Sequence, residues 1–165
     1  MKKMILTLLV ALPMSVFAQK FGHFNSADII QCMPEYVAVQ SRLQAISKEH
    51  ETQLQSMQDE FKLKADAYDK EKATMTDTQK QEREKELTAK NEIMQNYYQQ
   101  SQKELEKAQQ EERSKLSDKI NQAIEEIGKT GGFVYIMDTT SGIPYISKTL
   151  SVDVTEQLKK KLGVK

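Results

Sequence analysis

The sequence predicts a mainly helical α+β protein, in which a long antiparallel helical hairpin projects from a small β-rich body. Between Pro34 and Gly128 there are 93 consecutive residues without Gly or Pro, far more than the about 11–12 residues of a mean globular helix. A cluster of three Thr and one Asp interrupts the helical pattern near the middle. Short β-rich runs occur on both sides of this stretch. These observations place an arm at 34–127 with its tip near 74–80, and a body at 19–33 and 128–165.

The outgoing helix of the arm is expected to begin at Pro34, since proline is well tolerated at the first helical position. One stripe of this helix is mostly apolar, with spacings of three and four residues that form an eleven-residue repeat. That period of about 3.67 residues per turn predicts nearly straight or slightly right-handed packing against a partner helix. The stripe consists of Leu43, Ile46, His50, Leu54, Met57, Phe61, Ala65 and Tyr68.

The turn between the two helices is predicted from capping residues. Thr76 with Gln79, or Thr78 with Gln81, fits a capping box that would open a returning helix. The alternative is a single helix that continues through this region, because no Gly or Pro enforces a turn. We favour the hairpin because a returning helix supplies the partner that the apolar stripe needs.

The returning helix is expected from about Asp77 to Gly128. Its first third is almost wholly charged or amide, so the arm should be held more loosely near the tip than at the base. Tyr97 and Tyr98 are adjacent and cannot both face the partner helix, and Tyr97 is expected to point away. The predicted stripe is Met94, Tyr98, Ser101, Leu105, Ala108, Leu116, Ile120, Ile124 and Ile127.

Three short strands are predicted in the body, at 21–24, 133–137 and 143–146. Pro144 places the third strand toward a sheet edge. So small a body cannot bury both faces of a sheet within one chain. We therefore expect other copies of the chain to cover its apolar residues, in an oligomer whose order the residues do not fix. These oligomer-body residues are Phe21, Phe24, Phe133, Tyr135, Met137 and Tyr145.

Two short helices are predicted beside these strands. The first, at 27–33, is expected to be capped by Asn25 or Ser26. The second, at 154–162, is expected to open with a capping box that begins at Asp153.

The first 18 residues have the features of a cleaved signal peptide. Lys2 and Lys3 precede an apolar stretch that is too short to span a bilayer, and cleavage is expected after Ala18. A retained membrane anchor is the alternative. Export implies an oxidising compartment. The single Cys32 allows no internal disulfide there, and we interpret it as a small buried apolar side chain, with a reactive thiol or intersubunit bridge as the alternative.

Composition and motifs argue against nucleic-acid binding and against catalysis. The chain has 24 Lys and Arg against 24 Asp and Glu, so it lacks the basic footprint of a nucleic-acid-binding protein. His23 and His50 do not stand in metal-ligand spacing. The sequence also has no phosphate-binding Gly-rich loop and no nucleophile motif. We therefore expect no enzyme activity, no metal and no cofactor.

Methionine and aromatic residues on the otherwise polar arm are the candidate binding residues. Such side chains adapt to many apolar surfaces and suit weak, plural contacts with unfolded chains. The alternative interpretation is that they form the seam between the two helices. The candidate client-binding set is Met57, Phe61, Tyr68, Met75, Met94, Tyr97 and Tyr98.

The order of motifs along the chain is specific. A signal peptide and the run Phe24-Asn25-Ser26 are followed by Met33-Pro34, a long charged hairpin, a β-rich run at 132–138 and a final motif at 153–156. This order resembles the Skp/OmpH family of periplasmic chaperones over essentially the whole mature chain. The N-terminal motifs are similar to those of members from the Bacteroidetes group.

The resemblance implies a homotrimer in which strands of three chains form a small β-barrel and three arms enclose a cavity. Such proteins hold unfolded outer-membrane proteins in the periplasm without ATP and prevent their aggregation. The best-known relatives are strongly basic, whereas residues 62–90 here carry eight Lys and Arg against seven Asp and Glu. This balance argues against charge-steered contact with a membrane or with lipopolysaccharide. The alternative function is a structural coiled-coil spacer or adaptor of the cell envelope.

Overall fold

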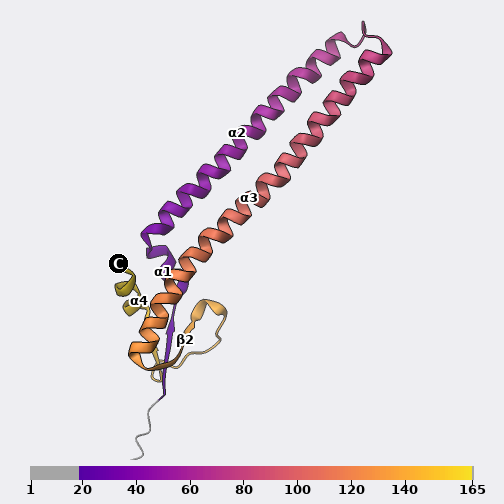
Figure 1. The fold of residues 1–165 in the computed structure, drawn as a ribbon. Helices are drawn as coiled ribbons and strands as arrows, with labels where there is room; N and C mark the ends of the chain where they lie inside the picture. Colours follow the sequence, from indigo (N-terminus) through magenta and orange to yellow (C-terminus); the bar gives the residue numbers. More distant parts are fainter. Residues whose placement is uncertain (1–18, 165) are drawn as a thin grey trace, which may run out of the picture.

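The computed structural model describes residues 19–164, so the predicted signal peptide lies outside the described residues. Two long helices pack as an antiparallel hairpin that projects from a small three-stranded sheet with short helices beside it (Figure 1). This confirms the predicted mainly helical fold with a helical hairpin. The elements are β1 (Lys20–Phe24), α1 (Ser26–Cys32), α2 (Pro34–Glu71), α3 (Asp77–Gly131), β2 (Phe133–Asp138), a 3-10 turn (Thr139–Ser141), β3 (Ser151–Asp153) and α4 (Thr155–Leu162).

The arm is formed by α2 and α3, and short-range signals set its ends. Pro34 occupies the first turn of α2, where its missing N–H leaves no helical hydrogen bond unmade. α3 opens with a capping box, in which the Gln79 N–H donates to Thr76 Oγ1 and the Thr76 N–H donates to the Gln79 side chain at 2.9 Å. The 38 residues of α2 correspond to about 57 Å at 1.5 Å per residue. The chain thus reverses without Gly or Pro, at a capping box that the sequence predicts.

The C-terminal end of α3 differs from the prediction. The helix passes Gly128, the expected stop, and ends at Gly131. Gly132 has a left-handed backbone with φ of 65°, and its N–H donates to the carbonyl of Gly128. The helix therefore ends at the glycine whose position requires positive φ, while Gly128 remains an ordinary helical residue.

The sheet is parallel, with β1 between β2 and β3. The predicted third strand at 143–146 is wrong, because the strand lies at Ser151–Asp153 and pairs there with Phe21–His23. Proline offers no N–H to a ladder, and Pro144 lies in the connection that precedes β3. In that connection the Leu150 N–H donates to Ser147 Oγ at 3.2 Å, which holds a turn directly before the strand.

The start of α4 also differs from the prediction. The helix begins at Thr155, and the expected capping box does not form. Asp153 is the last residue of β3, and its Oδ1 accepts the Thr155 N–H at 2.9 Å. Glu156 instead accepts a hydrogen bond from Lys159 at 2.9 Å. Strand pairing therefore takes Asp153 into the sheet, and the buried Val154 becomes the cap residue.

The core lies where α1, α4 and the base of the arm meet one face of the sheet. Ile29 of α1 and Leu158 of α4 are completely buried, as is Val154. The core residues are Phe24, Ile29, Met33, Val39, Leu116, Ile120, Ala123, Ile127, Val154 and Leu158. All of them belong to the body or to the part of the arm next to it, so the outer arm has no enclosed core of its own.

Candidate functional site

The seam between α2 and α3 follows the predicted stripe on the outgoing helix. Each of the eight stripe residues from Leu43 to Tyr68 is partly buried, while most of their neighbours along α2 are exposed. Met57, Phe61 and Tyr68 therefore lie in the seam, as does Met94 on α3. For these four candidate residues the geometry favours the seam interpretation.

The two adjacent tyrosines of α3 are oriented opposite to the prediction. Tyr97 is partly buried and faces α2, where its hydroxyl lies 2.9 Å from His50 Nδ1. Tyr98 has 54% of its surface exposed. Two stripes are compatible with the helical spacing between Met94 and Ser101. One takes a step of three residues to Tyr97 and then a step of four, and the other takes a step of four residues to Tyr98 and then a step of three. His50 selects Tyr97, because it offers a hydrogen-bond partner inside the seam.

A small polar network surrounds His50 in the middle of the arm. Besides Tyr97, whose ring centroid lies 5.8 Å away in an edge-on arrangement, His50 Nε2 is 3.6 Å from a carboxylate oxygen of Glu104. Both ring nitrogens of this polar seam residue are therefore directed at partners on α3. A polar contact of this kind inside an apolar seam favours one register of the hairpin over shifted ones.

Four large apolar side chains on the arm are exposed and do not belong to the seam. Their exposed fractions are 66% for Val37, 72% for Leu63, 57% for Ile93 and 54% for Tyr98. Sequence reasoning identified only Tyr98 as a candidate. The other three could have been found as apolar residues that fall outside the stripe of three- and four-residue spacings. Another molecule can contact these apolar side chains without disturbing the packing of α2 against α3.

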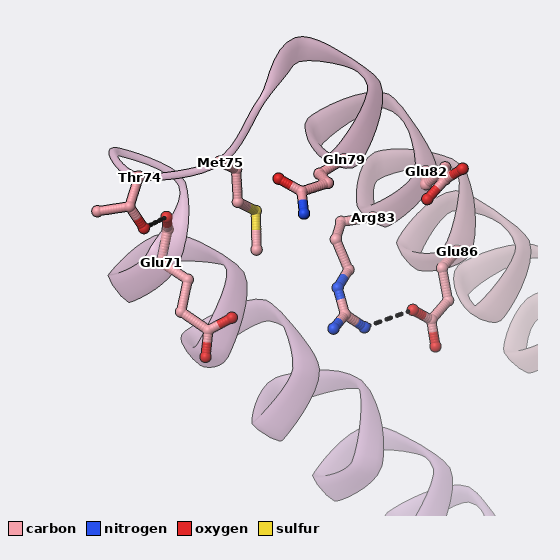
Figure 2. A pocket seen from close by; sticks show the side chains of 7 residues that line it. All are labelled: Glu71, Thr74, Met75, Gln79, Glu82, Arg83 and Glu86. Carbon is pink, nitrogen blue, oxygen red and sulfur yellow. Dashed lines mark hydrogen bonds and ion pairs between the residues drawn. The ribbon is translucent and has the colours of Figure 1, made fainter.

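The tip of the arm encloses an open pocket of about 550 Å³ between the end of α2 and the start of α3 (Figure 2). The Met75 side chain extends into the space between the two helices, and Arg83 pairs with Glu86 at 3.1 Å beside it. The lining residues are Glu71, Thr74, Met75, Gln79, Glu82, Arg83 and Glu86. Met75 is therefore separate from the continuous seam and is the one methionine in this otherwise polar lining.

Ion pairs connect the two helices along the whole arm. Near the tip, Lys64 pairs with Glu86, and Lys90 pairs with Glu60 at 2.6 Å. The hydrogen bond from Lys90 lowers the pKa of Glu60 below its ordinary value. Near the base, Lys119 pairs with Glu35. Such exposed pairs contribute little stability individually, so they mainly set which residues of the two helices face each other.

Glu112 is the one buried carboxylate of α3 among the described residues, and it has two cationic partners. Its Oε1 accepts from Lys115 Nζ at 2.8 Å and from Arg42 Nη1 at 2.5 Å. The hydrogen bond from Lys115, supported by that from Arg42, lowers the pKa of Glu112 below 4.5 although desolvation opposes the shift. The Arg42 contact makes Glu112 a link between α2 and α3 at the base of the arm.

Replacing Glu112 with Gln is expected to reduce the acid sensitivity of folding. A carboxylate whose pKa is lowered by folding stabilises the folded state at pH values above its ordinary pKa of 4.5. This contribution is lost as the pH falls through the lower pKa of the folded state. Urea unfolding at neutral pH and at about pH 3 should therefore show a smaller difference for Glu112→Gln than for the wild type. The control Glu49→Gln removes an exposed carboxylate and should leave that difference unchanged. Equal acid sensitivity of the wild type and Glu112→Gln would contradict the assignment.

One face of the sheet, here called the open sheet face, carries Phe21 and His23 of β1 and Tyr135 and Met137 of β2. The rings of Phe21 and Tyr135 lie 4.7 Å apart, and His23 Nδ1 is 2.8 Å from Ser151 Oγ. A pocket of about 210 Å³ lies between this face and the connection at 143–150. Tyr135 and Met137 are half exposed.

The other oligomer-body residues divide into two groups. Tyr145 has 79% of its surface exposed. Phe24 is buried within the chain, and Phe133 packs against the core and beside Gly131. The prediction that other copies must cover Phe24 is therefore wrong, because α1, α4 and the arm base already cover that side of the sheet.

Within residues 19–164 we find no group of three metal-ligating side chains that could hold an ion. The same described residues include no helix with the length and apolar character needed to cross a bilayer. Cys32 is a free, partly exposed cysteine of α1. Four surfaces offer contact area for binding: the exposed apolar side chains of the arm, the tip pocket, the open sheet face and a groove at the arm base.

Comparison with known proteins adds independent observations. The family model described as "Outer membrane protein (OmpH-like)" matches residues 20–162. The protein named Chaperone protein Skp from Yersinia enterocolitica is 27% identical over 156 residues, which cover 93% of this chain and 94% of that protein. Its namesake from Pectobacterium atrosepticum is 26% identical over 144 residues, with 86% and 87% covered.

A solved structure from Caulobacter crescentus CB15, described as an OmpH-like outer membrane chaperone, has the same fold. The TM-score is 0.74 at 21% sequence identity, and the match covers 87% of this chain and 83% of the other. At this level of identity the likeness concerns the fold, including the projecting hairpin.

Proposed function

Because the chain belongs to the OmpH-like outer membrane protein family, we propose that it is a periplasmic chaperone that holds unfolded outer-membrane proteins between its helical arms. It does so without ATP and prevents their aggregation. The curated relatives that carry the name chaperone match over nearly their whole length. Membership of a chaperone family also agrees with the expectation that the chain is not an enzyme.

The exposed apolar side chains of the arm support this proposal most directly. Leu63, Ile93 and Tyr98 lie on a projecting hairpin, where an unfolded chain can reach them. Each contact is weak by itself, but several contacts around one enclosed client give a high effective concentration. A client held in this way can leave without fuel when a later site binds or folds it more favourably.

We propose that three copies assemble through the open sheet face. β2 and β3 are both edge strands of a parallel sheet, and parallel sheets are normally covered on both faces. Phe21, Tyr135 and Met137 also form an apolar surface that one chain leaves open. Light scattering of the mature chain tests this assembly, and the mass of a single chain would contradict it.

The holding function is tested by diluting an unfolded outer-membrane β-barrel protein with and without the mature chain. The chain in excess should suppress light scattering by the client and co-elute with it. Replacing Leu63, Ile93 and Tyr98 together with Gln should weaken retention by at least about tenfold, because fully burying one such side chain contributes about 1.5–3 kcal/mol and about 1.4 kcal/mol already corresponds to tenfold in affinity. The far-UV circular dichroism of this variant should match that of the wild type.

A matched control replaces the exposed polar residues Gln58, Gln95 and Gln102 with Ala, and retention should stay at the wild-type level. Unchanged scattering and no complex with the wild-type chain would refute the holding function itself. Full retention by the Leu63, Ile93 and Tyr98 variant would instead show that other surfaces bind the client. A spacer protein would suppress no aggregation in either form.

A further inference from the structure

A groove of about 1010 Å³ runs along one side of the arm base, here called the base groove. It is bounded by α1, by α2 from Tyr36 to Ser47 and by α3 from Leu105 to Ser117. Ile30, Tyr36 and Leu43 contribute apolar surface to it and are partly buried against the core. Its volume lies at the upper end of the about 300–1,000 Å³ typical of ligand sites. The base groove is therefore large enough for more than a single side chain.

The polar lining of the base groove is unusual for this chain. Charged residues make up 29% of the sequence, yet Arg113 alone carries a charge among the described lining residues. Carboxamides take the place of the charges, from Gln40 and Gln44 on α2 and Gln109 on α3. A carboxamide both donates and accepts hydrogen bonds, which matches the alternating N–H and C=O groups of an extended backbone.

The length of the base groove sets the size of its occupant. From Tyr36 to Ser47 the helix rises about 16 Å at 1.5 Å per residue. An extended chain advances about 3.3 Å per residue, so about five residues fit along the groove. The apolar surface suits apolar side chains, and the isolated guanidinium of Arg113 suits one carboxylate. Arg113 forms no ion pair with another residue in the described part of the chain.

We propose that the base groove binds an extended segment of unfolded polypeptide, about five residues long, that is apolar except for one carboxylate paired with Arg113. This inference rests on the proposed chaperone function and assigns part of the client contact to a defined place. A segment with this pattern is common in unfolded chains and is hidden in folded ones. Binding here would therefore select unfolded clients.

A client segment fits the base groove better than a second copy of the chain. Copies have the open sheet face and two free strand edges available in the body. The base groove is instead lined by flexible Gln side chains and a cation, which suit occupants of varied sequence. An interface between copies is kept as an outcome of the experiment below.

The test uses tryptophan-containing peptides and the full mature chain. The chain has no Trp, so the fluorescence of acetyl-Leu-Trp-Asp-Val-Leu-amide reports peptide binding directly. Peptides with Asn or Lys in place of Asp serve as comparisons. We expect the Asp peptide to bind the wild type about two- to fivefold more tightly than the Asn peptide, the range of a solvent-accessible ion pair. Arg113→Gln should abolish this preference, and Arg113→Glu should reverse it in favour of the Lys peptide.

Lys103→Glu is the charge-matched control, since Lys103 is an exposed residue of α3 outside the base groove. It should leave the order of the three peptides unchanged. The proposal is overturned if no peptide binds, or if Arg113→Glu keeps the preference for Asp. It is also overturned if Arg113→Glu changes the assembled mass in light scattering, since the groove would then lie between copies. Suppression of client aggregation by the wild type, measured in parallel, separates these failures from a failure of the chaperone function.

Discussion

Replacing Leu158 with Ala is expected to lower the free energy of unfolding by about 2–5 kcal/mol. Leu158 is completely buried and belongs to the core that joins α4 to α1 and the arm base. Removing its side chain loses apolar burial and leaves a cavity that the helices around it can fill only in part. Because small domains are stable by about 5–15 kcal/mol, this single change removes a large part of the stability of the body. Urea unfolding followed by circular dichroism measures the effect.

The matched control is Leu150→Ala, the same substitution at a residue with 75% of its surface exposed. It should change the free energy of unfolding by no more than about 0.5 kcal/mol. Two equal effects would contradict the placement of the core at the α1 and α4 contact. A larger loss at Leu150 would show instead that assembly covers the connection before β3 and stabilises the chain there.

Replacing Gly131 with Ala is expected to destabilise the protein by about 1–3 kcal/mol, the usual cost of overpacking. A Cβ at this position would lie 2.5 and 2.7 Å from two ring atoms of Phe133. The ring cannot easily retreat, because it already lies close to Gly22, where a Cβ would meet ring atoms at 3.0 Å. The ammonium of Lys20 also lies 4.2 Å from the ring centroid. Thermal or urea unfolding measures the loss.

Gly128→Ala, three residues earlier in the same helix, is the control for this prediction. A Cβ there would lie 3.8 Å from Ile136 Cδ1, which is an ordinary van der Waals contact. Since Gly is about 1 kcal/mol worse than Ala inside a helix, this variant should be as stable as the wild type or slightly more stable. The pair separates helix propensity from crowding, and equal effects of the two substitutions would refute the close approach of Phe133 to the end of α3.

The hairpin could be predicted from the sequence because its signals are local and agree with one another. The long stretch without Gly or Pro, the eleven-residue stripe and the capping box at Thr76 all concern residues that are neighbours in the chain. The predicted stripe of α2 is correct at every position, because only one series of three- and four-residue steps connects its apolar residues. Where two paths exist on α3, through Tyr97 or Tyr98, the choice depends on His50 across the seam.

The wrong predictions for the body arose because its elements depend on contacts between residues far apart in the sequence. The third strand at Ser151–Asp153 has only one apolar residue, Val152, and is defined by pairing with β1 rather than by its own composition. The segment at 143–146 has strand-like residues but no free edge of β1 to pair with. The same pairing removes Asp153 from the cap of α4. Interactions between residues far apart in sequence decided these elements, and local patterns cannot reveal them.

The candidate binding residues were the least predictable part. Met57, Phe61 and Met94 are suitable residue types for contact with a client, yet their position in the stripe places them in the seam. Leu63 and Ile93 were missed because a single apolar residue outside the stripe of a charged helix carries little signal by itself. The base groove has no sequence signature at all, because α1, α2 and α3 form it together.

The parallel pairing of β1 with β2 constrains the order in which the protein can form. β1 and β2 stand at opposite ends of the arm in the sequence, and Ser26 contacts Thr140 across a separation of 114 residues. Because the chain is synthesised from its N-terminus, β1 is made early and stays without a partner until the entire arm has followed. The contacts between α2 and α3 near the tip join residues that are close in the sequence. The hairpin can therefore form in the meantime, starting from its tip. An incompletely synthesised chain would thus present a formed helical arm attached to a body whose sheet has not yet formed.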